Sequence, residues 1–308
     1  MIRRGSLVVA VASAVLLGCG TTNAQIGGGL FGYDAAAPLD VRETSSSASG
    51  GVRTIELTYA SPKGGRVPAT LVLPEGRRGP VAIFQHGAGN ASRNDFRVEA
   101  EDLARAGLAS LLVDAPLARP RARSWMTFQL RDRAGYVQNV VDIRRAIDLL
   151  AQRPDVDATH VALVGHSYGG SIVGVVAGVE TRVDAVVVMA GPGRMTDFLR
   201  REGQAWIRQG ATRKLRAARK KQLARYLAYM RAVDAAEHVG RATAPILFQF
   251  GRQDELPARW FQAYVDAAPP ANRVEWYDAG HTLCDCATRD RKAWLLERLG
   301  TAANNAAR

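Results

Sequence analysis

The stretch HVALVGHSYGGS, residues 160–171, decides the fold. Its first five residues are apolar enough for a buried strand, and the small residues that follow Gly169 favour a helix. Gly165 and Gly169 flank Ser167 and allow the chain to turn very sharply between these two elements. The stretch is therefore either a plain strand-to-helix turn or a turn that presents the Ser167 hydroxyl as a nucleophile. The strand and the helix on its two sides favour the nucleophile.

Outward from this stretch, buried strands alternate with helices in both directions. The alternation predicts an α/β domain with a mostly parallel central sheet of about eight strands and helices on both faces. Ligand sites in such sheets lie at the carboxyl ends of the strands, so the loops after strands are the place to look for chemistry. The expected strands are 52–61, 67–76, 81–89, 108–116, 160–165, 184–191, 244–251 and 273–280, and the expected helices are 95–107, 136–154, 170–179, 257–268 and 288–300.

The N-terminus has the pattern of an export signal. A basic start, MIRR, precedes an apolar run over 7–17 that is too short to span a bilayer. We expect residues 1–24 to be a signal peptide, with two alternative cleavage sites. Residues 16–19 resemble a bacterial lipobox, which would leave a lipidated Cys19 attached to a membrane, whereas 22–24 suit ordinary signal cleavage. Both predict an exported protein: a periplasmic or cell-envelope lipoprotein, or a secreted protein.

Composition divides the rest of the 308-residue chain into segments. The chain has 47% hydrophobic and 23% charged residues, which excludes a disordered or fibrous protein. Gly, Ser and Ala dominate residues 25–51, which we expect to be a flexible linker. We expect the catalytic domain to span 52–300, with a helical insert at 192–240 after the sixth strand, and 301–308 to be a disordered tail.

The formal net charge of +12 is concentrated in the insert. No acidic residue occurs in 203–233. A solvated cationic face explains this charge most simply, and anionic envelope surfaces or acidic substrates are the alternatives. No aromatic stacking pattern accompanies the charge, so nucleic acid is not an expected partner. The basic residues are Arg208, Arg213, Lys214, Arg216, Arg219, Lys220, Lys221, Arg225 and Arg231.

A serine nucleophile needs a base, and His281 is the expected one. It follows the last expected strand, in YDAGHTL, and so lies at the same sheet edge as Ser167. The other histidines fit less well. His160 and His166 are too close in sequence to fold back onto Ser167, His86 belongs to a glycine loop in which the backbone matters more than the ring, and His238 sits beside the insert.

The third group must orient His281, and Asp254 is the expected acid. It lies just past a strand end in FQFGRQDEL, three residues after a glycine that lets the chain turn. Glu255 and Asp278 are the rival candidates.

Negative charge on the substrate oxygen requires preorganised donors. We expect the backbone N–H groups of Tyr168, next to the nucleophile, and of Ala88, in the QHGAG loop, to form the oxyanion hole.

The order Ser167, Asp254, His281, each at a strand end, resembles the α/β-hydrolase superfamily. The resemblance extends from about Val52 to Leu299, which implies the α/β-hydrolase fold. The motifs look like those of dienelactone hydrolase-like and prolyl-oligopeptidase-like esterases. Dienelactone hydrolases proper use a cysteine nucleophile, so Ser167 indicates the serine esterase branch. The motifs are QHGAG at 85–89, VVDIRRAIDLLAQRPDVDATHVALVGHSYGG at 140–170, ILFQFGRQDELP at 246–257 and YDAGH at 277–281.

The insert occupies the position where relatives carry a lid over the pocket. We expect an inward-facing stripe there, and the alternative is a packed helix pair that does not contact the substrate. Cys284 and Cys286, just after His281, form either a strained local bridge or two unpaired thiols. The expected stripe consists of Leu215, Leu223, Leu227 and Met230, with Trp206 and Tyr226 nearby.

Together these features predict an exported serine hydrolase that cleaves carboxylic esters through an acyl-enzyme. The expected substrate is a small-molecule or lipid-like ester, and no metal or organic cofactor is required. One alternative is a peptidase or amidase on the same fold. Another is a catalytically silent envelope-binding module that uses the basic insert.

Overall fold

The computed structural model describes residues 25–26, 29–120, 124–270 and 272–300. The expected signal peptide at 1–24 and tail at 301–308 lie outside these residues. Within the described ranges, no helix combines the length and apolar character needed to cross a bilayer.

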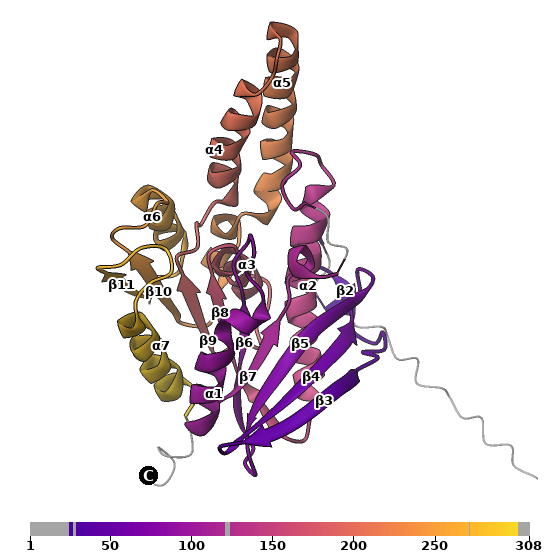
Figure 1. The fold of residues 1–308 in the computed structure, drawn as a ribbon, viewed down its shortest axis with the longest axis vertical. Helices are drawn as coiled ribbons and strands as arrows, with labels where there is room; N and C mark the ends of the chain where they lie inside the picture. Colours follow the sequence, from indigo (N-terminus) through magenta and orange to yellow (C-terminus); the bar gives the residue numbers. More distant parts are fainter. Residues whose placement is uncertain (1–24, 27–28, 121–123, 271, 301–308) are drawn as a thin grey trace, which may run out of the picture.

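A nine-stranded sheet forms the centre of the domain, in the order β11-β10-β9-β8-β6-β7-β5-β4-β3 (Figure 1). The strands from β11 to β7 are parallel, and the remaining three are antiparallel. The expected fold is confirmed, with one strand more than the eight predicted. The parallel strands are β6 (Gly79–Gln85), β7 (Ala109–Val113), β8 (Val156–His166), β9 (Ala185–Met189), β10 (Ile246–Gly251) and β11 (Arg273–Tyr277), and the antiparallel ones are β3 (Arg42–Ser49), β4 (Val52–Ala60) and β5 (Arg66–Pro74).

Helices cover both faces of this sheet, as predicted. Alternate residues of β8 serve two hydrophobic cores: Val161 and Leu163 face one, and Ala162 and Val164 face the other. The first core lies under α2 (Asp132–Ala151), α3 (Tyr168–Ala177) and α6 (Ala258–Ala267), and the second under α1 (Arg97–Arg105) and α7 (Asp285–Arg298). Short 3-10 helices occupy Arg93–Phe96, Pro116–Ala118, Arg231–Val233, Ala235–Glu237 and Val239–Arg241.

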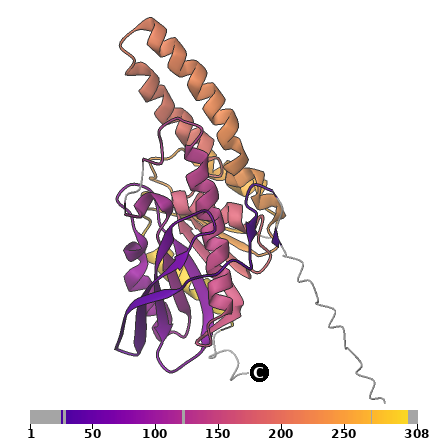
Figure 2. The same cartoon turned by 90° about the vertical axis from the view of Figure 1, so that its right-hand side faces the viewer.

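The insert is a helical hairpin that projects from the domain beyond the carboxyl ends of the strands (Figures 1 and 2). It consists of α4 (Met195–Arg208) and α5 (Arg213–Met230) and follows β9. Leu223, Leu227 and Met230 are buried as expected, but Leu215 is 40% exposed and does not belong to the inward stripe. The reason is position: Leu215 lies in the first turn of α5, next to the turn between the two helices, whereas the buried residues of α5 lie in its C-terminal half.

The prediction of a flexible linker at 25–51 is wrong for much of that segment. β3 spans Arg42–Ser49 and pairs with β4 along the edge of the sheet. All its side chains are exposed, and its sequence, RETSSSAS, has no apolar pattern. Main-chain hydrogen bonds hold this strand, so composition alone did not reveal it.

The segment before β3 is anchored to α2. Phe31, Tyr33 and Leu39 are buried in the domain. The buried guanidinium of Arg144 donates to the carbonyl of Phe31 at 2.9 Å, and that of Arg145 donates to the carbonyl of Ala35 at 2.9 Å. Within this segment β2 (Tyr33–Asp34) pairs with β1 (Gln25–Ile26). The folded domain therefore begins well before the expected Val52.

Candidate active site

Ser167 sits on a strained turn between β8 and α3. Its φ of 55° lies in the left-handed region, which a residue with a side chain rarely adopts. The Ser167 N–H donates to the carbonyl of Met189 at 2.8 Å and fixes the turn against β9. A Cβ on Gly169 would lie 2.1 Å from the carbonyl oxygen of Gln85, and one on Gly165 would lie 2.3 Å from that of Gly169. Both positions therefore require glycine.

The structure brings the three sequence-predicted side chains into one hydrogen-bonded chain. The Oγ of Ser167 lies 2.8 Å from Nε2 of His281, and Nδ1 of His281 lies 2.8 Å from Oδ2 of Asp254. The other oxygen of Asp254 accepts the backbone N–H of Leu256 at 2.8 Å. The three side chains follow β8, β11 and β10, whose parallel arrangement puts their carboxyl ends at one edge.

Two opposing effects set the basicity of His281. Burial by itself lowers the pKa of the imidazole, but the hydrogen bond and the charge of Asp254 outweigh it, so the pKa is raised above its usual 6.5. With the ring proton on Nδ1 and donated to Asp254, Nε2 is free to accept the proton of the Ser167 hydroxyl. This arrangement can activate the serine as a nucleophile.

Among the described residues, neither rival acid, Asp278 or Glu255, forms a hydrogen bond with His281. Asp278 accepts a hydrogen bond from Gln253 at 2.6 Å. Glu255 is exposed, although one of its oxygens lies within 4.8 Å of ligand atoms of Asp254 and His281. This spacing is compatible with a metal ion, but the same atoms of Asp254 and His281 already bond to each other.

The expected oxyanion-hole segments lie beside Ser167. Tyr168 begins α3, so its N–H is one of the donors without an acceptor inside the helix. The loop after β6 passes close by, since a Cβ on Gly87 would lie 3.4 Å from Cβ of Ser167. Ala88 follows Gly87 in that loop.

Two histidines, the buried His86 and the partly buried His166, connect the loops around the site in ways that no local sequence signal indicated. His86 Nε2 accepts the N–H of Ala115 at 3.0 Å, and Nδ1 lies 2.7 Å from the carbonyl of Gly87. Its ring therefore joins the loops after β6 and β7, although the sequence had suggested that its backbone matters more than its ring. Burial lowers the pKa of His86, which keeps the ring neutral as this bonding requires.

His166, in the turn itself, supports His281. Its Nε2 lies 2.8 Å from the carbonyl oxygen of His281, and burial lowers its pKa, so a neutral ring donates this hydrogen bond. The contact holds the main chain of His281 against the residue next to Ser167. The separation of 115 positions along the chain explains why no local signal revealed it.

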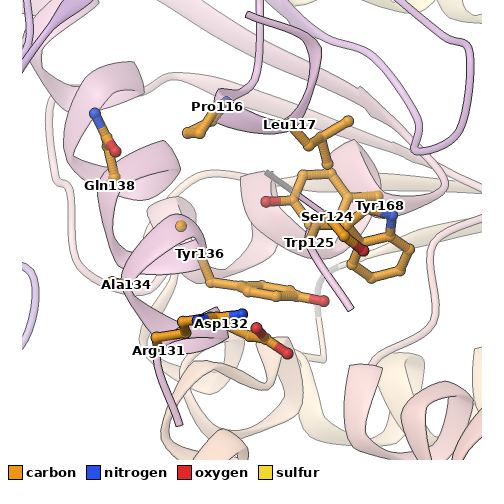
Figure 3. A pocket seen from close by; sticks show the side chains of 11 residues that line it. Pro116, Leu117, Ser124, Trp125, Arg131, Asp132, Ala134, Tyr136, Gln138 and Tyr168 are labelled. Carbon is orange, nitrogen blue, oxygen red and sulfur yellow. The ribbon is translucent and has the colours of Figure 1, made fainter. Parts of the chain in front are cut away.

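A pocket of about 380 Å³ opens beside Tyr168 (Figure 3). Trp125 lies next to Tyr168, with ring centroids 5.8 Å apart, and stacks on Phe198 of α4 at 6.0 Å. The base of the insert therefore contacts the pocket wall. The sequence carried no signal for Trp125, which belongs to a loop between β7 and α2. The lining residues are Pro116, Leu117, Ser124, Trp125, Arg131, Asp132, Ala134, Gly135, Tyr136, Gln138 and Tyr168.

Cys284 and Cys286 form a disulfide and are not two unpaired thiols. Cys284 is the N-terminal capping position of α7, three residues after His281. The bridge therefore closes the end of the loop that carries His281.

Comparisons with known proteins assign the chain to a family. A model of the alpha/beta hydrolase family matches residues 81–295. The chain therefore belongs to that family, and this supports a hydrolase. No curated protein sequence matches the chain.

Solved structures share the fold at low identity. An acetyl xylan esterase from Paenibacillus sp. R4 superimposes with a TM-score of 0.67 at 21% identity, over 85% of this chain and 90% of that one. A putative dienelactone hydrolase from Klebsiella pneumoniae superimposes with a TM-score of 0.56 at 14% identity, over 81% of this chain and 99% of that one. A prolyl endopeptidase superimposes with a TM-score of 0.63 at 20% identity, over 82% of this chain but only 39% of the endopeptidase chain. The expected resemblance to these groups is confirmed at the level of the fold.

Proposed function

We propose that this protein is a serine esterase that cleaves carboxylic esters through an acyl-enzyme. The observation that carries the proposal is the unbroken chain of hydrogen bonds from Ser167 through His281 to Asp254. Its nucleophile sits on the strained turn at the carboxyl edge of the sheet, where the hydroxyl is presented to a ligand.

In the proposed reaction, Ser167 Oγ attacks the ester carbonyl while His281 Nε2 takes the hydroxyl proton. The carbonyl π electrons move to the oxygen and form a tetrahedral oxyanion. The N–H groups of Tyr168 and Ala88 donate to that oxyanion. Its collapse breaks the bond to the alkoxy group, which leaves with the proton from His281. Water, deprotonated by the same imidazole, then attacks the acyl-Ser167 ester. The second tetrahedral intermediate collapses, the bond between the acyl carbon and Ser167 Oγ breaks, His281 returns the proton to that oxygen, and the acid leaves.

The pocket beside Tyr168 is the proposed substrate site. It adjoins Tyr168, whose N–H is one of the proposed oxyanion donors, and the aromatic rings of Trp125, Tyr136 and Tyr168 line it (Figure 3). Such rings suit a flat or sugar-like apolar face more than a charged group. Phe198 stacks on Trp125, so we propose that the insert shapes this pocket from its base.

Esters are favoured over amides as substrates. Two structural neighbours are named acetyl xylan esterases, and the chain matches each of them over more than four fifths of its length. A peptidase or amidase is the second candidate, because a prolyl endopeptidase shares the fold. That enzyme is much longer, since the match covers 39% of it.

The protein is also proposed to act outside the cytoplasm. The basic start and short apolar run of residues 1–17 support export, and the Cys284–Cys286 disulfide is typical of an oxidising compartment. A lipidated Cys19 would attach the enzyme to a membrane.

The test is active-site labelling with a fluorophosphonate, followed by peptide mass spectrometry. We expect an adduct on Ser167 that is lost in His281→Ala, because without the base the hydroxyl is a poor nucleophile. Hydrolysis of a panel of matched esters and amides then ranks the two candidates. A folded protein that forms no adduct would refute the proposed nucleophile, and faster cleavage of the amides would favour the peptidase.

A further inference from the structure

A second pocket, of about 450 Å³, lies between the insert and α6. Four arginines line it: Arg194 caps the N-terminus of α4, Arg200 and Arg201 lie near the middle of that helix, and Arg259 lies in the first turn of α6. Asp197 is the one acidic residue in its lining. The formal charge of the lining is therefore strongly positive.

This pocket is built on the same loops that carry the active site. Pro257, which lines it, follows Asp254 by three residues. Arg194 follows the loop after β9, and in that loop Gly191 packs on the nucleophile helix, since a Cβ on Gly170 would lie 3.0 Å from Cα of Gly191. The pocket thus belongs to the carboxyl edge of the sheet.

The two walls are tied together and one arginine is held in place. The N–H of Gly193 donates to the carbonyl of Trp260 at 3.2 Å, which joins the loop before α4 to α6. The guanidinium of Arg201 lies 5.3 Å from the ring of Trp260 and 5.1 Å from that of Phe198. It also donates to Glu202 at 3.0 Å.

The other three arginines are without partners. Across the described part of the chain, the side chains of Arg194, Arg200 and Arg259 form no hydrogen bond or ion pair with another residue. All four arginine side chains are exposed, so water solvates them, and their combined positive field favours an anion that enters the pocket. Arg194 and Pro257 are also the N-terminal capping positions of α4 and α6, whose N-terminal ends add partial positive charge.

We propose that this arginine pocket binds the carboxylate or phosphate group of a small molecule. Guanidinium groups match such oxyanions with paired N–H donors. A pocket of this volume suits a small molecule, and the ring of Trp260 offers an apolar wall beside the charged group. Where the anion is part of the ester cleaved at Ser167, this pocket selects acidic esters, an extension that rests on the proposed function.

Binding is tested without catalysis, in Ser167→Ala. Glutarate and inorganic phosphate, each titrated by calorimetry at low salt, separate the two oxyanion sources. We expect at least one of them to bind, and the double variant R200A/R259A to weaken that binding about tenfold or more, which corresponds to about 1.4 kcal/mol. The matched control is R213A/K220A, which removes two positive charges from exposed positions of α5 outside the pocket.

The outcomes decide the proposal. A selective loss in R200A/R259A supports the pocket. Equal weakening in the control pair would show that binding follows net charge, and no binding of either anion to Ser167→Ala would overturn the proposal outright. Both measurements are independent of whether the protein is an esterase.

The extension to substrates is tested with a matched pair of esters, p-nitrophenyl acetate and mono-p-nitrophenyl glutarate. We expect R200A/R259A to raise KM about tenfold for the glutarate ester and to leave that for the acetate ester unchanged. Equal KM changes for both esters would reject the extension. Absence of hydrolysis of both by the unchanged protein would instead reject the proposed function, while the binding result stands.

Discussion

His281 is held between two partners that act on different parts of the residue. Its Nδ1 lies 2.8 Å from Oδ2 of Asp254, and its carbonyl oxygen lies 2.8 Å from Nε2 of His166. The first contact fixes the ring and its tautomer, and the second fixes the main chain next to the nucleophile. The position of Nε2 against Ser167 follows from both.

Replacing Asp254 with Asn should leave the fold intact and remove most of the activity. The Asn side chain cannot stabilise the imidazolium and favours the wrong tautomer, so kcat should fall by roughly 10³–10⁴. Steady-state ester hydrolysis measures this, with thermal unfolding as the check on folding. Glu255→Gln is the control, because Glu255 is exposed and close to His281. A larger loss in that control would identify Glu255 as the acid.

The acid limb of the pH profile should lie above the usual pKa of histidine. Asp254 raises the pKa of His281 above 6.5, and a proton on Nε2 blocks the general base, so kcat/KM should fall as pH drops through that raised value. In Asp254→Asn the limb should move to lower pH, because burial then acts without the opposing carboxylate. If the acid limb stays at the same pH in Asp254→Asn, the limb reports the titration of a group other than His281.

Gly169→Ala should destabilise the whole domain. The new Cβ would lie 2.1 Å from the carbonyl oxygen of Gln85 in β6, and backbone on both sides leaves little room to relax. We expect a loss of at least about 2 kcal/mol in the free energy of unfolding. Gly135→Ala is the matched control: nothing lies within 4 Å of its Cβ, so it should stabilise α2 by about 0.5–1 kcal/mol. Equal melting temperatures would contradict the close approach.

Asp234 should make stability fall as pH rises towards neutrality. It is buried and accepts the N–H of Thr196 at 3.0 Å, which joins the two ends of the insert. Burial raises its pKa from 3.8 to about 7, so between these values the unfolded chain has lost a proton that the folded protein keeps. Unfolding is therefore increasingly favoured as pH rises through this window.

Asp234→Asn should remove that slope. The reason is that the Asn amide accepts the Thr196 N–H without titrating. Melting temperatures measured from pH 4 to 8 give the slope. Asp266→Asn, at an exposed position of α6, is the control and should keep the slope of the unchanged protein. If Asp234→Asn retains the full pH dependence, another group causes it.

The fold was predictable because the buried strands and the glycine-flanked turn have strong local signals. The central strands are short apolar runs that alternate with helices, and that alternation predicts an α/β fold with a mostly parallel sheet. β3 was missed for the opposite reason. Its polar, exposed side chains carry no periodic signal, and its stability comes from backbone pairing with β4.

The chain by itself determined which residues stand at the ends of the strands, and so placed Ser167, Asp254 and His281 at one edge. Local sequence sufficed there because parallel strands bring their carboxyl ends together whatever lies between them. Only the tertiary structure decided which residues meet across that edge: the ring of His166 on the carbonyl of His281, Trp125 beside Tyr168, and the arginines of α4 and α6 around one pocket. Those contacts depend on how whole elements pack, and packing distances are not encoded in any local pattern of residues.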